Sequence, residues 1–184
     1  MEIATRRLQL SRPTEADAVP LQRLWRDERV QRFLGGARSE ENAAACVAAV
    51  RTHWEVYGFG RWVVRARGAD TIIGLCGLCH LDDEIEVSYK FVPTAWGQGF
   101  ATEAARASLT YGFGPVRLDR IVAIARVDNA GSHHVLEKLG ARYERIVRKW
   151  EAAWRFYAFA RTQWPAEAVS LAPHSVNSLA DLPP

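Results

Sequence analysis

The decisive segment of this sequence is Trp96-Gly97-Gln98-Gly99-Phe100-Ala101-Thr102, which joins a predicted strand to a predicted helix. Gly97 and Gly99 lack a Cβ atom, so the loop can turn tightly and bring its backbone N–H groups close to a ligand. The first N–H groups of the following helix have no partner inside the helix, and the helix dipole adds about half a positive charge there. Such a loop suits a phosphate or pyrophosphate group.

Two well-known phosphate-binding patterns match this loop incompletely. A P-loop requires a lysine directly after its second glycine, and no lysine follows Gly99. A Rossmann fingerprint would use Gly97, Gly99 and the acidic residue Asp119, which lies about 20 residues further on. However, Thr102 occupies the place of the third glycine, and Asp119 begins a predicted strand instead of ending one. The glycines alone therefore predict a phosphate-binding turn, with a dinucleotide site as the competing interpretation.

Apolar periodicity and chain-breaking residues predict the elements on either side of the loop. Several hairpin-linked strands precede one β-α-β unit, which indicates the α+β class with a largely antiparallel sheet and one parallel crossover. Residues 1–164 are expected to form a single domain, and residues 165–184 a loosely ordered C-terminal tail. Strands are expected at 3–12, 62–67, 72–78, 85–92, 121–127, 143–149 and 154–161, and helices at 14–25, 39–57, 102–113 and 130–139.

The composition is that of an ordinary globular protein. The 184 residues are 48% hydrophobic and 24% charged, with a net charge of +3 that is spread along the chain. This balance fits the handling of phosphate-bearing small molecules and argues against a nucleic-acid partner. The sequence shows neither a signal peptide nor an apolar stretch of about 18 residues, so no membrane partner is expected and a cytoplasmic location is predicted.

The cysteines predict neither a disulfide framework nor a metal site. Cys46, Cys76 and Cys79 are an odd number. The stretch Cys76-Gly77-Leu78-Cys79-His80 matches the c-type haem pattern, but it falls within a predicted strand, where residues three apart point to opposite faces. The sequence offers no second Cys/His pair to complete a zinc site. We therefore predict a protein without a metal.

A resemblance to a known family extends this interpretation. Val92-Pro93-x-x-Trp96-Gly97-Gln98-Gly99-Phe100-Ala101-Thr102-Glu103-Ala104 resembles the acetyl-CoA-binding segment of the GNAT acetyltransferase superfamily, and within it the ribosomal-protein-alanine N-acetyltransferase (RimJ/RimL-type) branch. Residues 6–13, 73–78 and 128–140 resemble further conserved stretches of that family, in the same order. The resemblance implies a three-layer α/β/α fold with a mixed, mostly antiparallel central sheet that splays at the cofactor site.

The resemblance also implies which residues bind acetyl-CoA. The backbone of Phe91 and Val92 would bond the pantetheine arm as an added strand does. Asn129 and Ser132 would line the far side of the pantetheine channel, although their position at a helix start equally fits capping. The pyrophosphate would lie on the N–H groups of Gly97, Gln98, Gly99, Phe100, Ala101 and Thr102.

The implied reaction is attack of a primary amine on the thioester of acetyl-CoA. An acceptor amine must first lose a proton, which a carboxylate can take if burial raises its pKa. Glu86 is the candidate catalytic base because its spacing to Val92 matches a catalytic glutamate of the family, and Glu84 is the alternative. Leu136 stands where many relatives carry a tyrosine acid. A non-catalytic acyl-CoA-binding or regulatory module is therefore the alternative function.

The acceptor side is the least defined part of the sequence interpretation. Trp25, Phe33 and Arg38 flank the Gly35-Gly36 break, and the corresponding region of the family forms one wall of the acceptor cleft. These three residues are candidate substrate contacts, although core packing is the more frequent role for a tryptophan or phenylalanine. The sequence does not specify whether the acceptor is a protein N-terminus or a small-molecule amine. A homodimer is compatible with the sequence, but no pattern requires one.

Overall fold

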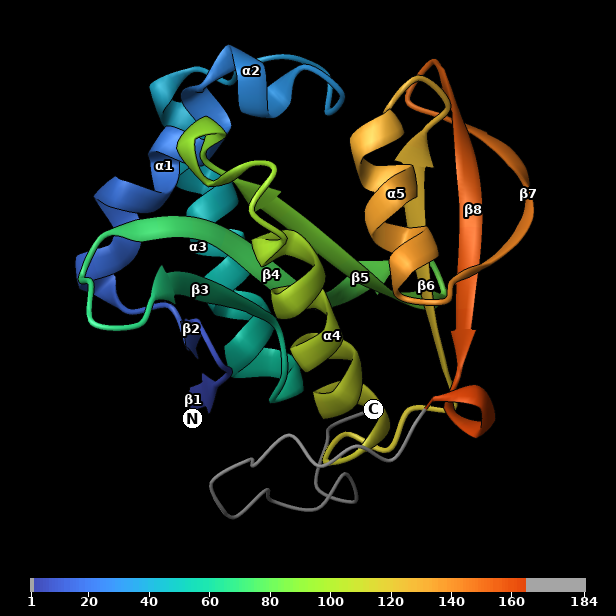
Figure 1. Ribbon diagram of the computed structural model, residues 1–184. Coiled ribbons are helices and arrows are strands. Elements are labelled where there is room, and N and C mark those ends of the chain that lie inside the picture. Colours follow the sequence, from blue (N-terminus) through green and yellow to red (C-terminus); the bar gives the residue numbers. More distant parts are fainter. Residues whose placement is uncertain (1, 165–184) are drawn as a thin grey trace.

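The structure is a computed structural model that describes residues 2–164, so the predicted tail at 165–184 lies outside the described residues (Figure 1). Its strands are β1 (Glu2–Ala4), β2 (Leu8–Ser11), β3 (Arg61–Ala66), β4 (Ile72–Leu81), β5 (Glu84–Phe91), β6 (Arg120–Arg126), β7 (Arg142–Lys149) and β8 (Ala152–Ala160). Its α-helices are α1 (Ala18–Arg26), α2 (Glu28–Gln31), α3 (Glu40–Tyr57), α4 (Phe100–Phe113) and α5 (Ala130–Lys138). Short 3-10 turns lie at η1 (Glu15–Asp17), η2 (Pro93–Ala95) and η3 (Arg161–Gln163).

The strands form one mixed sheet in the order β1-β2-β3-β4-β5-β6-β8-β7. The pair β5–β6 is parallel, and the other neighbouring pairs are antiparallel. Helices α1 and α3 pack on one face of the sheet, and α4 and α5 cover the other (Figure 1). The predicted α+β class and the three-layer arrangement are therefore confirmed.

The sheet opens between β5 and β6. These strands pair in register at one position, Glu86 with Val122, whereas β4 and β5 stay paired from Leu81–Glu84 to Gly74–Phe91. Beyond the contact, β5 runs toward α2 while β6 runs behind α5, so the strands diverge (Figure 1). The predicted splay is confirmed, and it leaves one edge of β5 without a neighbouring strand.

The sequence prediction of one strand at 3–12 is wrong, because the chain folds there as the β1–β2 hairpin. The turn between them is held by Thr5, whose hydroxyl accepts a hydrogen bond from the Leu8 N–H at 3.0 Å and donates to Glu103 at 2.6 Å. Glu103 lies far away in the sequence, so no local pattern could reveal this turn. The helix predicted at 102–113 begins two residues earlier, at Phe100, because Gly99 is its N-cap.

The predicted caps of the other helices agree with the structure. Ser39 accepts a hydrogen bond from the Asn42 N–H at 3.2 Å at the start of α3, and Gly58 ends that helix in the left-handed conformation. Gly140, with φ of +80°, follows α5. Local capping chemistry thus determines most helix ends in this chain.

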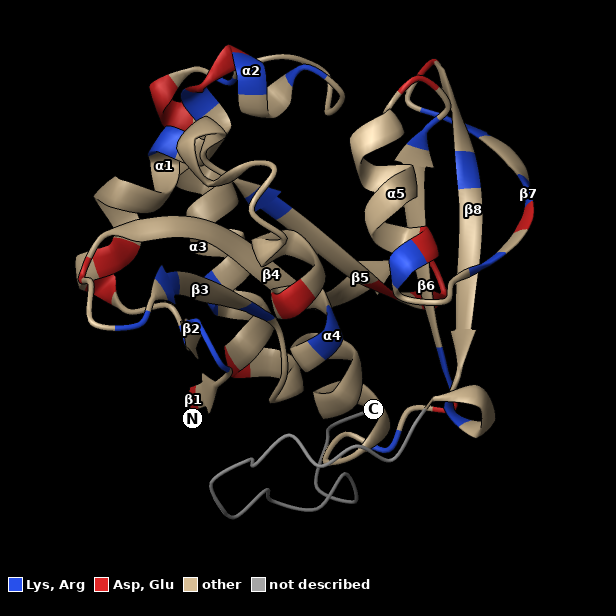
Figure 2. Ribbon diagram, in the orientation of Figure 1, with Lys and Arg blue, Asp and Glu red and all other residues tan. Residues whose placement is uncertain are grey.

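Two observations bear on the expected partners. In residues 2–164, no helix combines the length and apolar character required to cross a membrane. Over the same residues, His, Cys, Asp and Glu side chains do not gather in a group of three that could hold a metal ion. Basic and acidic residues are interspersed over the strands and helices, with Lys and Arg most frequent along β7 (Figure 2).

Candidate active site

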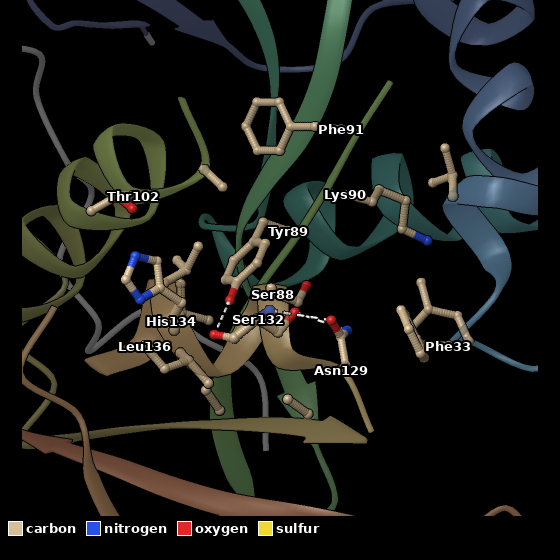
Figure 3. A pocket seen from close by; sticks show the side chains of 18 of the residues that line it. Phe33, Ser88, Tyr89, Lys90, Phe91, Thr102, Asn129, Ser132, His134 and Leu136 are labelled. Atoms are coloured by element: carbon tan, nitrogen blue, oxygen red, sulfur yellow. Dashed lines mark hydrogen bonds between the residues drawn. The ribbon is translucent and has the colours of Figure 1, made fainter. Parts of the chain in front are cut away.

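A cavity of about 780 Å³ occupies the splay between β5 and β6. Its wall is formed by β5 and β6, single residues of β3 and β4, the glycine loop, the first turn of α4, α5, the segment around α2 and the β7–β8 hairpin. Figure 3 shows Phe33 and Lys90 on one side of this cavity and Thr102, His134 and Leu136 on the other. The cavity therefore has a side next to the glycine loop and an opposite side next to α2.

The glycine loop presents unpaired backbone donors to the cavity. Gly97 and Gly99 have φ values of +73° and +77°, a region that other residues rarely adopt. Gly99 caps α4 without a side-chain hydrogen bond, and the first intrahelical bond of α4 runs from the Glu103 N–H to the Gly99 carbonyl at 3.1 Å. The N–H groups of Phe100, Ala101 and Thr102 therefore lack intrahelical acceptors, which suits them to bind an anion.

Arg7 and Glu103 hold this loop against the β1–β2 turn. Arg7 donates from Nη1 to the Gln98 carbonyl at 2.9 Å and from Nε to Glu103 Oε2 at 2.7 Å, and its guanidinium lies 4.7 Å from the centre of the Phe100 ring. The Arg7 backbone N–H also donates to Glu103 Oε1 at 2.8 Å. Sequence reasoning did not assign a role to either residue, although both lie within the stretches that resemble the family.

We expect Glu103→Gln to destabilise the fold and loosen the loop. Burial raises the pKa of Glu103, but hydrogen bonds from Thr5 and Arg7 and the Arg7 charge outweigh it and lower the pKa overall. A carboxylate with a lowered pKa stabilises the fold above its unfolded pKa of about 4.3, and this stabilisation is lost as pH falls through the folded value. Urea unfolding at pH 7 should show a loss of about 1–3 kcal/mol. An equal free energy of unfolding in both proteins would contradict this role.

The backbone of β5 faces the cavity at alternate residues. The Val92 N–H donates to the Ile73 carbonyl of the β4 side at 2.9 Å, and the Val92 carbonyl accepts from Ala95. Because antiparallel hydrogen bonding alternates along a strand, the backbone groups of Phe91 and Tyr89 point away from β4, toward the splay. The Phe91 carbonyl already accepts the Trp96 indole N–H at 2.8 Å. The structure thus orients Phe91 and Tyr89, but not Val92, toward a ligand.

The first turn of α5 forms the opposite wall of the splay. Asn129 accepts the Ser132 N–H at 3.2 Å and donates to the Ser132 hydroxyl at 3.0 Å, so it is a helix cap, and both residues also line the cavity. Tyr89 reaches across the splay and donates to the Ser132 carbonyl at 3.3 Å (Figure 3). Leu136 lines the cavity with 1% of its surface exposed.

Glu86 lies in the cavity wall at the point where β5 and β6 part. Burial raises the pKa of its carboxyl group to about 7, against the opposing influence of the Arg61 charge and of the Ile124 N–H. Cys79 pairs with Glu86 across the strands, and its thiol lies 3.8 Å from the carboxylate. A carboxyl group that ionises near neutral pH is suited to accept and release a proton.

The alternative carboxylate, Glu84, has a different environment. Its Oε1 lies 3.2 Å from Arg120 Nε, and Arg120 also binds Glu144 at 2.9 Å. Glu84 is not among the residues that line the cavity. The structure therefore places Glu84 in an ion-pair network and Glu86 in the cavity.

The remaining sequence-predicted residues are dispersed. Phe33 lines the cavity, whereas Trp25 is 4% exposed within the core formed by α1 and α3. Arg38 is exposed, donates to the Leu34 carbonyl at 3.2 Å and does not line the cavity. Gln98 is also outside the cavity wall, because its side chain donates to the Thr94 carbonyl at 2.7 Å. Of the three acceptor candidates, the structure brings only Phe33 to the cavity.

The sequence analysis assigned no role to the four basic residues that line the cavity, Arg29, Arg61, Lys90 and Lys138, and two of them lie near Glu86. Lys90 could have been found, because it lies on the same face of β5 as Glu86 by strand alternation. Arg61 could not, because its approach to Glu86 depends on the pairing of β3, β4 and β5. Both line the cavity.

The chain has close counterparts among known proteins. The family model described as an acetyltransferase (GNAT) domain matches residues 7–142. YoaA of Bacillus subtilis (strain 168), an uncharacterized N-acetyltransferase, is 28% identical over 154 residues, which cover 80% of this chain and 86% of YoaA. A GNAT-family acetyltransferase structure from Bacillus anthracis superposes with a TM-score of 0.76 at 24% identity, over 89% of this chain and 100% of that one.

A further solved structure is relevant because it contains a ligand. RimL, a ribosomal L7/L12 alpha-N-protein acetyltransferase in complex with coenzyme A, has a TM-score of 0.74 at 18% identity, over 87% of this chain and 98% of that one. At this identity the likeness establishes a shared fold.

Proposed function

Because this chain belongs to the GNAT acetyltransferase family, an acyltransferase family that uses acetyl-CoA, we propose that it acetylates a primary amine with Glu86 as the general base. One observation carries the proposal. Glu86 lies in the wall of the splay, and burial raises its pKa to about 7, so it can hold or release a proton at neutral pH.

We place acetyl-CoA on the glycine-loop side of the cavity as part of this proposal. The N–H groups of Phe100, Ala101 and Thr102, at the positive end of α4, would hold the pyrophosphate. The backbone of Tyr89 and Phe91 would bond the pantetheine arm in the manner of an added strand. Bound acetyl-CoA supplies a thioester, and the chain supplies the surfaces that orient it.

The proton transfers follow from the positions of the side chains. Glu86 would accept the proton of the acceptor ammonium, directly or through a water molecule. The free amine then attacks the thioester carbonyl, and the C–N bond forms as the C–S bond breaks. The attacking nitrogen still carries one proton more than the amide product, and it releases this proton to solvent. Leu136 cannot donate a proton, so the departing thiolate, with a pKa near the ~8.5 of a cysteine thiol, takes one from solvent.

We expect kcat at saturating substrates to rise with pH through an apparent pKa of about 7, because the base acts when Glu86 is ionised. The acceptor can bind as its ammonium when Glu86 is the base, so kcat/KM should show no second rise between about pH 8 and 10, where amines lose their own proton. Stopped assays of thiol release from pH 5.5 to 9.5 would measure both ranges. In Glu86→Gln the lower transition should vanish, and activity should rise only as the amine itself loses its proton. A lower transition that persists in the variant would exclude Glu86 as its origin.

The proposed function is tested by incubating the protein with acetyl-CoA and a panel of primary amines while free thiol is measured. Amine-dependent thiol release supports it. Thermal stabilisation by CoA without thiol release for any amine would favour a non-catalytic acyl-CoA-binding module. A ligand that binds only the folded state stabilises it by about 2.7 kcal/mol at a concentration 100 times its Kd, so an unchanged Tm would contradict CoA binding.

We also propose kinship with the RimJ/RimL-type branch. The pattern from Trp96 to Ala104 supports it, as does the shared fold with RimL. A protein N-terminus is the acceptor that this kinship favours, and a small-molecule amine is the alternative. Mass spectrometry of acetylated peptides and small amines would distinguish the two.

A further inference from the structure

The α2 side of the cavity carries more positive than negative charge. Arg29, Arg61 and Lys90 line it, and within residues 2–164 Glu86 is the one acidic side chain of the cavity wall. This is the side on which the acceptor must lie if acetyl-CoA occupies the glycine-loop side. The charge of this wall therefore bears on which amines can enter.

The three basic residues differ in how their charge is balanced. Arg29 is paired with its neighbour Asp27, at 2.7 Å from Nη2 and 3.1 Å from Nε. For Arg61 and Lys90, no carboxylate in the described chain lies within ion-pair distance, 4.0 Å. Both are half-buried, and the Lys90 ammonium lies 4.2 Å from the centre of the Trp25 ring. Among the described residues, neither Arg61 nor Lys90 is thus held in an ion pair, although the Glu86 carboxylate lies in the same cavity wall and feels both charges.

Strand register explains why these two cations act on the same space. Arg61 lies opposite Gly77, and Gly77 lies opposite Ser88 of β5, so Arg61 shares a face with Ser88, Glu86 and Lys90. Gly77 has no side chain to stand between them. A Cβ on Gly77 would lie 2.4 Å from the Gly60 carbonyl oxygen, so this position cannot take a larger residue without displacing β3. The bare position lets Arg61 extend over β4 toward Glu86 and Lys90.

The electrostatic influence of Arg61 is consistent with this placement. Burial, together with the Arg61 and Arg38 charges, lowers the pKa of Lys90 to about 7, while Cys46 and Cys79 oppose the shift. The same Arg61 charge opposes the rise in the pKa of Glu86. An anion between Arg61 and Lys90 would relieve this repulsion, whereas an additional cation would increase it.

We propose that the acceptor carries a carboxylate or phosphate group close to its primary amine, and that Arg61 and Lys90 bind this group while Glu86 takes the proton of the amine. This rests on the proposed function, because it assigns the α2 side of the cavity to the acceptor. It favours the small-molecule alternative over an ordinary protein N-terminus, which has no anionic group beside its amine. It also excludes polycationic amines, such as polyamines and aminoglycosides, as preferred substrates.

The test compares amines that differ only in the anionic group. One pair is phenylalanine and phenylalaninamide, and a second is phosphoethanolamine and ethanolamine, with spermidine as a polycation. We expect kcat/KM to be at least about tenfold higher for the anionic member of one pair, as a hydrogen bond to a charged group predicts. A larger kcat/KM ratio for the phenylalanine pair would identify a carboxylate site, and a larger ratio for the phosphoethanolamine pair a phosphate site. Arg61→Gln and Lys90→Gln should each reduce the ratio by about tenfold or more.

Arg29→Gln is the matched control, because Arg29 lines the same wall but is neutralised by Asp27. It should leave the ratio unchanged. Calorimetric titration of the CoA-saturated protein with the same pairs gives a measure that does not require turnover. Equal kcat/KM for both members of each pair, or preferred turnover of spermidine, would overturn the anion site while the proposed function stands. Preferential binding of the anionic members without any turnover would support the site and contradict the proposed function.

Discussion

Glu86→Gln is expected to lower kcat at saturating acetyl-CoA by about 100-fold or more, the range typical for loss of a positioned general base. The amide has nearly the shape of the carboxylate, so it should keep the packing around Cys79 and Ile124 while it cannot accept a proton. Rapid-quench or continuous thiol assays at pH 7.5 would measure the loss. A kcat within a factor of two of the unmodified protein would remove Glu86 from the mechanism.

The matched control for this substitution is Glu84→Gln. Glu84 lies two residues away on the same face of β5, but it is bound to Arg120 and lies outside the cavity wall. It should leave kcat close to that of the unmodified protein. If Glu84→Gln abolished turnover and Glu86→Gln did not, the assignment of the base would be reversed.

Stability provides a check that Glu86→Gln folds. Burial raises the pKa of Glu86 above the ~4.3 of an exposed glutamate, so the folded state holds its proton more tightly than the unfolded state does. The free energy of unfolding of the unmodified protein should therefore decrease as pH rises from about 4.3 to about 7. The glutamine variant should not show this decrease, because it has no carboxyl group to ionise there. Thermal unfolding at pH 8 should show the variant at least as stable as the unmodified protein.

Gly99→Val is expected to weaken CoA binding by about 10- to 100-fold, with a smaller effect on folding. Gly99 has φ of +77°, which disfavours a β-branched residue by about 1–2 kcal/mol. A Cβ there would lie 3.4 Å from Arg7 Nη2, so valine should also disturb the contact that holds the loop and its N–H groups in place. Each charge-assisted hydrogen bond lost from the pyrophosphate accounts for about 1.5–3 kcal/mol. Titration calorimetry with CoA would measure the change in Kd.

Gly68→Val separates backbone strain from ligand contact. Gly68 also has φ of +77°, and a Cβ there would meet no other atom within 4 Å, but it lies in the β3–β4 turn and not in the cavity wall. It should destabilise the fold comparably and leave the Kd for CoA unchanged. Retained CoA affinity in Gly99→Val would mean that the pyrophosphate binds elsewhere.

The sequence by itself determined the features that local chemistry controls. Gly97 and Gly99 marked the left-handed turn before α4, Ser39 and Gly58 marked the ends of α3, and hairpin-linked strands before one β-α-β unit marked the mixed sheet. Each signal depends on the conformational limits of a few neighbouring residues, so it can be recognised without knowledge of the fold. Glu86 was chosen on a different ground, because its spacing to Val92 matches a catalytic glutamate of the resembling family.

Tertiary structure decided the features that depend on contacts between distant segments. Glu103 accepts hydrogen bonds from Thr5 and Arg7, and so stabilises the β1–β2 turn and keeps Arg7 against the glycine loop. Arg7 and Glu103 are 96 residues apart in the sequence. Trp25 packs in the core and Phe33 lines the cavity, although the sequence made both equal candidates for the acceptor wall. Arg61 lines the same cavity as Glu86 because the register places Gly77, which has no side chain, between Arg61 and Ser88. Such placements depend on the packing and pairing of whole elements, which periodicity in one segment cannot encode.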